Sequence, residues 1–144
     1  MDTRLISKKK EAPTKVFVYG TLKVGGRFDS GEIRANRRTK SDGIIRGFKM
    51  IDLGSFPGIV DSDSENDVVR GELHEFDNLP AVMERLDMIE GYSEKDIKNS
   101  LYTREVLEVE DKTTGKKVLA YAYKFNQLKK VGNFRIVKDG NWKL

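Results

Sequence analysis

The run Val16-Phe17-Val18-Tyr19-Gly20-Thr21-Leu22-Lys23 carries the clearest structural signal in this 144-residue chain. Its first half is apolar and β-branched, which predicts a short buried strand over Lys15–Tyr19. Four glycines between positions 20 and 31 follow, and they predict a long loop. A loop of this length in a compact domain is usually either functional or mobile.

The junction at Tyr19, Gly20, Thr21 and Leu22 is the first candidate binding site. A strand that ends in glycine leaves successive backbone N–H groups free to point at one spot, where they can bind a carboxylate, a phosphate or an oxyanion. The spacing matches neither G-x-x-x-x-G-K-[ST] nor G-x-G-x-x-G. The alternative interpretation is an ordinary tight turn after a core strand.

The rest of the chain predicts several strands around one clear helix. The helix begins with Asp77 or Asn78 as its cap and Pro80 in its first turn, and it ends at Gly91. Apolar residues between Val82 and Ile89 recur at helical spacing. Strands are expected over Ile44–Asp52, Gly58–Val60, Val68–Phe76, Leu101–Asp111 and Lys117–Phe125, with a hairpin at Lys112–Lys116 and a less regular tail over residues 126–144. This order predicts an α+β fold, and a curled, barrel-like sheet would remove exposed strand edges.

Length and composition favour one domain over residues 15–144, preceded by a flexible basic arm at residues 1–14. The absence of cysteine excludes disulfides, thiolate catalysis and cysteine-ligated metals. A zinc site with several histidines is also excluded, because His74 is the only histidine. We interpret His74 as a surface or strand-pairing residue and not as a ligand.

The net charge of +4 is divided unevenly along the chain. Residues 1–49 carry 13 Lys/Arg and 5 Asp/Glu, residues 50–94 carry 2 and 12, and residues 95–144 carry 12 and 6. A nucleic-acid-binding protein more often has a continuous basic face, so we do not expect nucleic acid as a partner. No apolar run is long enough to span a membrane and the N-terminus does not read as a secretory signal, so we expect a cytoplasmic protein.

Glu90 is the candidate general acid/base. It follows the apolar stripe of the predicted helix, and the partial negative charge of a helix C-terminus disfavours a carboxylate there. Burial beside Ile89 and Tyr92 would raise the pKa of Glu90 toward the range useful for proton transfer. The alternative is an ordinary surface glutamate.

Tyr102 and Arg104 form a third candidate, at the start of a predicted strand. Tyr102 can donate a hydrogen bond and Arg104 can hold a carboxylate. The spacing by itself favours a simple Tyr/Arg pair at a strand edge.

Taken in order, these blocks resemble the γ-glutamylcyclotransferase-like family, especially its γ-glutamylamine cyclotransferase branch. The resemblance begins with the Val16–Lys23 run and Gly25 and spans about residues 15–142. It continues through Phe56-Pro57-Gly58-Ile59-Val60, Val69-Arg70-Gly71-Glu72-Leu73, Leu86-Asp87-Met88-Ile89-Glu90-Gly91-Tyr92, Tyr102-Thr103-Arg104 and Gly140-Asn141-Trp142.

The resemblance implies a small mixed β-barrel with flanking helices. It implies that the Tyr19–Leu22 turn holds the α-carboxylate of a γ-glutamyl group and that Glu90 occupies the catalytic glutamate position. The family reaction releases 5-oxoproline and an amine from a γ-glutamyl amine or peptide, and it needs no metal and no cofactor.

The sequence departs from the family pattern at two places. After Gly25 it reads Gly26-Arg27-Phe28-Asp29, without the usual asparagine, and Asn141 stands where an aspartate is common. If Arg27 and Phe28 reach the pocket, they are expected to shape specificity. Two other hypotheses stay open: a non-catalytic module that binds small γ-glutamyl-like ligands, and an interaction protein that uses its basic ends. The amine leaving group and the oligomeric state are not predicted.

Overall fold

The computed structural model describes residues 12–144, so most of the predicted arm at residues 1–14 lies outside the described residues. The α+β expectation is confirmed. The strands are β1 (Lys15–Val18), β2 (Arg37–Arg46), β3 (Phe48–Asp52), β4 (Pro57–Asp61), β5 (Val68–Phe76), β6 (Tyr102–Asp111), β7 (Lys117–Phe125) and β8 (Arg135–Val137). The helices are α2 (Gly31–Asn36), α3 (Leu79–Glu90) and the single 3-10 turns η1 (Ile97–Asn99) and η2 (Leu128–Lys130).

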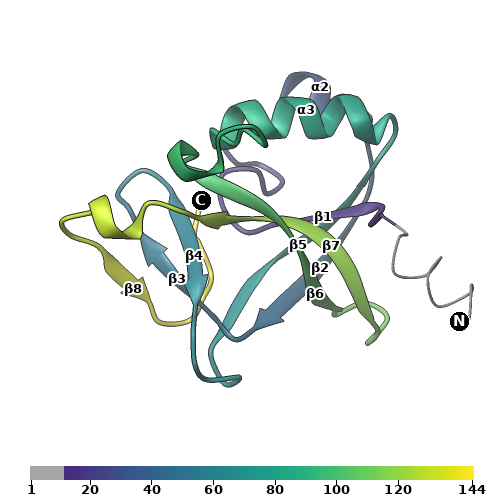
Figure 1. The fold of residues 1–144 in the computed structure, drawn as a ribbon. Helices are drawn as coiled ribbons and strands as arrows, with labels where there is room; N and C mark the ends of the chain where they lie inside the picture. The colour runs from purple at the N-terminus through teal and green to yellow at the C-terminus, as the bar shows by residue number, and fades with distance from the viewer. Residues whose placement is uncertain (1–11) are drawn as a thin grey trace, which may run out of the picture.

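Five strands close into the expected barrel, in the order β1-β5-β2-β6-β7 (Figure 1). Neighbouring strands run antiparallel except at the closure, where β1 and β7 pair in parallel through Val16 and Tyr121. Closure leaves none of these five strands as an open edge.

A second sheet, in the order β4-β3-β8, lies beside the barrel (Figure 1). It corrects the single strand expected over Ile44–Asp52. Gly47 adopts a left-handed φ of 82°, which turns the chain between β2 in the barrel and β3 in the second sheet. The tail predicted as less regular also contributes β8, which pairs with β3.

Both helices lie together on one side of the barrel (Figure 1). α3 has Pro80 in its first turn and ends at Gly91, whose φ is 63°, as the sequence predicts. Asn78 is the N-cap residue, but its side chain makes no capping hydrogen bond and its own φ is left-handed. The short helix α2 was not predicted; it follows the glycine-rich loop and contributes the buried Ile33.

Two apolar clusters lie on opposite faces of β1, as strand alternation requires. One packs Val16 and Val18 against the helices, and the other places Phe17 and Tyr19 in the barrel. The helical cluster also contains Leu22, Ile33, Phe76, Val82, Met83 and Leu86, whereas the barrel cluster contains Ile45, Val69, Leu73, Val109, Ala120 and Ala122. The residues that follow β1 therefore belong to both clusters: Tyr19 packs in the barrel cluster and Leu22 in the helical cluster.

Within the described residues, no helix is long and apolar enough to cross a membrane.

The C-terminal segment is fixed on β5, where Arg70 N–H donates to the Gly140 carbonyl oxygen at 2.7 Å. Gly140→Ala should lower the free energy of unfolding by about 1–3 kcal/mol, because the residue has a left-handed φ and an added Cβ would lie 2.0 Å from the Val68 carbonyl oxygen. Urea unfolding measures this change. Gly132→Ala is the control, since its Cβ would meet nothing within 4 Å. Equal effects of the two substitutions would contradict the close packing of Gly140.

Candidate active site

A cavity of about 200 Å³ opens between the end of β1, the loop after it, the segment before β4 and the end of α3. Its lining is mostly apolar, with few polar groups. The lining residues are Phe17, Val18, Tyr19, Gly20, Thr21, Leu22, Arg27, Phe28, Ser55, Phe56, Pro57, Ile89, Glu90, Leu101, Tyr102 and Tyr123. The volume lies below the usual range of about 300–1,000 Å³ for pockets that enclose drug-sized ligands.

The Tyr19–Leu22 segment lines this cavity as predicted. Gly20 is required by a close approach, because a Cβ there would lie 2.6 Å from Cγ of the Pro57 ring. The turn is closed by Lys23 N–H, which donates to the Gly20 carbonyl oxygen at 3.0 Å. Within the described part of the chain, the N–H groups of Thr21 and Leu22 donate to no protein acceptor. They are therefore available to an anionic ligand group.

Glu90 is the last residue of α3, and its side chain lines the same cavity. Its carboxylate has no hydrogen-bond or ion-pair partner among residues 12–144. Burial in these apolar surroundings raises the pKa of Glu90 to about 7. At neutral pH the carboxyl group can thus either accept or donate a proton.

Three tyrosines supply hydroxyl groups to the lining of the cavity: Tyr19, Tyr102 and Tyr123. The Tyr19 hydroxyl donates to the Tyr123 carbonyl oxygen at 2.6 Å, and the Tyr102 hydroxyl donates to the Pro57 carbonyl oxygen at 2.7 Å. Burial raises the pKa of Tyr102, and the nearby Glu90 charge raises it further. The hydroxyl protons of Tyr19 and Tyr102 are committed to backbone oxygens, so toward a ligand these hydroxyls can act as acceptors.

Arg104 does not line the cavity, in contrast to the other predicted site residues. Its guanidinium donates to Asp87 Oδ2 at 2.6 Å and lies over the rings of Tyr92 and Tyr121. Asp87 accepts a second hydrogen bond from the Tyr123 hydroxyl at 2.6 Å, on Oδ1. Asp87 precedes Glu90 by three positions on α3, so this contact holds the end of the helix against β6 and β7.

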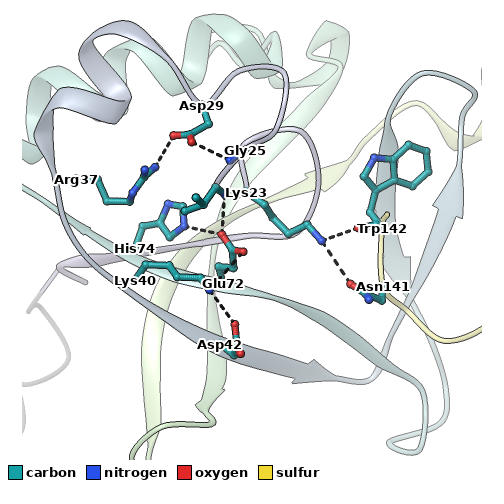
Figure 2. A network of polar contacts seen from close by, with 11 residues as sticks. Lys23, Gly25, Asp29, Arg37, Lys40, Asp42, Glu72, His74, Asn141 and Trp142 are labelled. Carbon is teal, nitrogen blue, oxygen red and sulfur yellow. Dashed lines mark hydrogen bonds and ion pairs between the residues drawn. The ribbon is translucent and has the colours of Figure 1, made fainter. Parts of the chain in front are cut away.

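Two carboxylates, Glu72 from β5 and Asp29 from the loop itself, bond the backbone of the loop after Gly20 (Figure 2). Glu72 accepts Val24 N–H at 2.9 Å, and Asp29 accepts Gly25 N–H at 2.9 Å while pairing with Arg37. Burial would raise the pKa of Asp29, but the hydrogen bonds from Arg37 and Gly25 outweigh it and lower the pKa. Both acids therefore remain charged anchors of the loop at neutral pH.

The C-terminal block that the sequence singled out also reaches this loop. Lys23 Nζ donates to the Trp142 carbonyl oxygen at 2.5 Å, with Asn141 Oδ1 at 3.4 Å (Figure 2). Asn141 thus lies outside the cavity lining, and its contact with Lys23 ties the chain end to the loop.

His74 is fully buried, so its interpretation as a surface residue is wrong, whereas the strand-pairing interpretation is confirmed. Its Nε2 lies 3.0 Å from Glu72 Oε1, and its Nδ1 has no hydrogen-bond partner in the described chain. His74 therefore supports the loop through Glu72 (Figure 2). It is not among the residues that line the cavity.

The sequence did not identify Ser55, Phe56 or Tyr123 as site residues. Phe56 and Pro57 belong to a motif that was recognised, but no periodicity indicated that they face Glu90. Tyr121, Tyr123 and Phe125 are two residues apart along β7, so their side chains share one face of the strand. This spacing does not indicate what that face contacts. Among the described residues, no group of three or more His, Cys, Asp or Glu side chains is arranged to hold a metal ion.

Asp87→Asn should lower the free energy of unfolding by about 1–3 kcal/mol, because it removes the charge that Arg104 and Tyr123 bond. Chemical denaturation measures the loss. Glu84→Gln is the matched control, a neutralised acid on an exposed position of the same helix. If both variants were equally stable, Asp87 would not be holding the helix end.

The family model described as "Gamma-glutamyl cyclotransferase, AIG2-like" matches residues 16–144. No curated protein matches the chain significantly in sequence.

Solved structures share the fold. E. coli ytfP superimposes with a TM-score of 0.62 at 23% identity, covering 89% of this chain and 95% of ytfP. An aig2-like protein from Mus musculus gives 0.61 at 22% identity, covering 79% and 78%. Bacillus subtilis YkqA gives 0.64 at 21% identity and covers 91% of this chain, which spans only 40% of YkqA. Because the family model matches nearly the whole chain, the chain belongs to the AIG2-like gamma-glutamyl cyclotransferase family.

Proposed function

We propose that this protein cyclises a γ-glutamyl amine or peptide to 5-oxoproline and releases the amine, with Glu90 as the general acid/base. The observation that carries this proposal is that the cavity joins the Tyr19–Leu22 turn to Glu90, a half-buried residue whose carboxyl group is desolvated and has no hydrogen-bond or ion-pair partner within residues 12–144. Membership in the cyclotransferase family supports the reaction class. The γ-glutamylamine branch is the one that the Val16–Lys23 run resembles.

The reaction needs no nucleophile from the protein. The α-amine of the substrate attacks its own side-chain carbonyl, so a carbon–nitrogen bond forms within a five-membered ring and the bond to the leaving amine breaks. Glu90 takes a proton from the attacking ammonium, and the resulting carboxylic acid returns a proton to the departing nitrogen. No water is consumed.

The protein therefore has to hold the substrate in a folded conformation and to transfer protons to and from it. Well-oriented intramolecular attack reaches effective molarities of roughly 10⁵–10⁸ M. The free N–H groups of Thr21 and Leu22 are the donors proposed for the substrate α-carboxylate. The oxygens of Tyr19 and Tyr102 are acceptors suited to its ammonium group.

Arg104 makes no substrate contact in the proposed reaction, although its chemistry in the sequence indicated that it could hold a carboxylate. Its guanidinium is engaged by Asp87 outside the cavity lining. We assign Arg104 to positioning the end of α3, and through it Glu90.

Glu90→Gln should lower kcat/KM for 5-oxoproline release by roughly 10²–10⁴-fold, the usual contribution of a general acid/base. The assay uses a panel of γ-glutamyl amino acids, γ-glutamyl amines and glutathione. Glu94→Gln, a neutralised acid at a nearby exposed position, is the control and should retain activity. Thermal stabilisation by these compounds without product from the wild type would instead support a non-catalytic binding module.

Glu90→Gln should also be more stable than the wild type above pH 7, and the two should be equally stable below pH 4.5. Because the pKa of Glu90 rises from 4.5 unfolded to about 7 folded, the native state binds more protons between these values. Wild-type stability therefore falls as pH rises through this window, by at most about 3 kcal/mol. Urea unfolding of both proteins at pH 4.5 and 8.5 measures the difference. A constant gap across this range would show that the carboxyl is not desolvated.

A further inference from the structure

The second charged side chain in the cavity lining belongs to Arg27. This exposed residue lies in the part of the loop that departs from the family pattern. Its guanidinium lies 5.3 Å from the centre of the Phe28 ring, and Phe28 also lines the cavity. Within residues 12–144, Arg27 has no acidic partner within ion-pair distance. An unpaired guanidinium at a cavity can receive a carboxylate from a ligand.

The exposure of the lining distinguishes an inner from an outer end. Tyr19, Leu22 and Tyr102 are buried, whereas Arg27 and Leu101 are exposed. A γ-glutamyl compound that places its glutamyl end at the Tyr19–Leu22 turn and Glu90 must extend its leaving group toward the outer end. There the leaving group meets the charge of Arg27 and the apolar surfaces of Phe28, Phe56 and Leu101.

The loop holds Arg27 at this end through its backbone. Phe28 N–H donates to the Thr21 carbonyl oxygen at 2.9 Å, and Asp29 N–H donates to the Gly26 carbonyl oxygen at 3.1 Å. The buried Asp29 side chain fixes Gly25 and Arg37. Arg27 therefore projects from a segment that is anchored on both sides.

We propose that Arg27 is a specificity-determining residue that binds the carboxylate of the leaving group, so that the preferred substrate is a γ-glutamyl amino acid with an apolar or aromatic side chain. This inference rests on the proposed function. The Phe28, Phe56 and Leu101 surfaces receive the apolar side chain. A leaving group that carries an amino group at this point is disfavoured, because the guanidinium repels it.

The test compares γ-glutamyl-phenylalanine with γ-glutamyl-phenethylamine, which has the same ring and amide but lacks the carboxylate. The wild type should have a kcat/KM for 5-oxoproline release at least about tenfold higher with the first compound, as a charge-assisted hydrogen bond implies. In Arg27→Gln this ratio should fall toward one. Arg34→Gln, an exposed arginine on α2 outside the lining, should keep the wild-type ratio.

Two results would overturn the inference. One is a wild-type ratio near one, and the other is an unchanged ratio in Arg27→Gln. The second would arise if Arg27 held the glutamyl α-carboxylate, which both compounds share, because both rates would then fall together.

Binding to the inactive Glu90→Gln variant separates this inference from the proposed function. Calorimetry with the same two compounds should show the same preference, and Glu90→Gln/Arg27→Gln should lose it. Binding preference without any 5-oxoproline from the wild type would refute the proposed reaction and leave the role of Arg27 intact. Turnover of both compounds without a preference in either measurement would refute the role of Arg27 alone.

Discussion

The desolvation of the Glu90 carboxyl group is the constraint on which the site depends. A carboxyl without a hydrogen-bonding partner in apolar surroundings destabilises its ionised form, and burial raises its pKa to about 7. A freely moving helix end would relieve this by exposing the half-buried side chain more fully to water. Asp87, one turn earlier on α3, is bonded by Arg104 and Tyr123 from the barrel wall, and these bonds hold the helix end in place. The ion pair outside the cavity and the lone acid inside it are thus parts of one arrangement.

The loop after β1, which also lines the cavity, is likewise fixed by carboxylate groups. Glycines give the loop after β1 its shape, but glycines also make a loop mobile, since they lose the most conformational entropy on folding. Glu72 and Asp29 counter this by accepting the consecutive N–H groups of Val24 and Gly25. The N–H groups of Thr21 and Leu22, two residues that line the cavity, donate to no acceptor in the described residues. Buried His74 belongs to this support because it shares Glu72.

The sequence predicted most strands, the main helix and the closed barrel, because these follow from apolar periodicity and from the need to avoid strand edges. It placed Glu90 and the Tyr19–Leu22 turn, which line one cavity, because both adjoin strong element ends. It could not anticipate that Gly47 divides the strand expected over Ile44–Asp52, since a left-handed φ is a property of the folded chain. Arg104 had the right chemistry for a carboxylate, but its partner is Asp87, and pairing across 17 positions leaves no local pattern.

The two charged side chains in the cavity lining differ in exposure, and this difference suits the role proposed for each. A guanidinium beside Glu90 would stabilise the carboxylate and return its pKa toward the ordinary value, which would weaken it as a proton donor. Burial is the cause of the raised pKa of Glu90. The exposed Arg27 guanidinium avoids the desolvation penalty of a buried ion. One cavity can therefore hold a neutralisable acid for proton transfer and a permanent cation for recognition, because the acid is half-buried and desolvated whereas the cation is exposed.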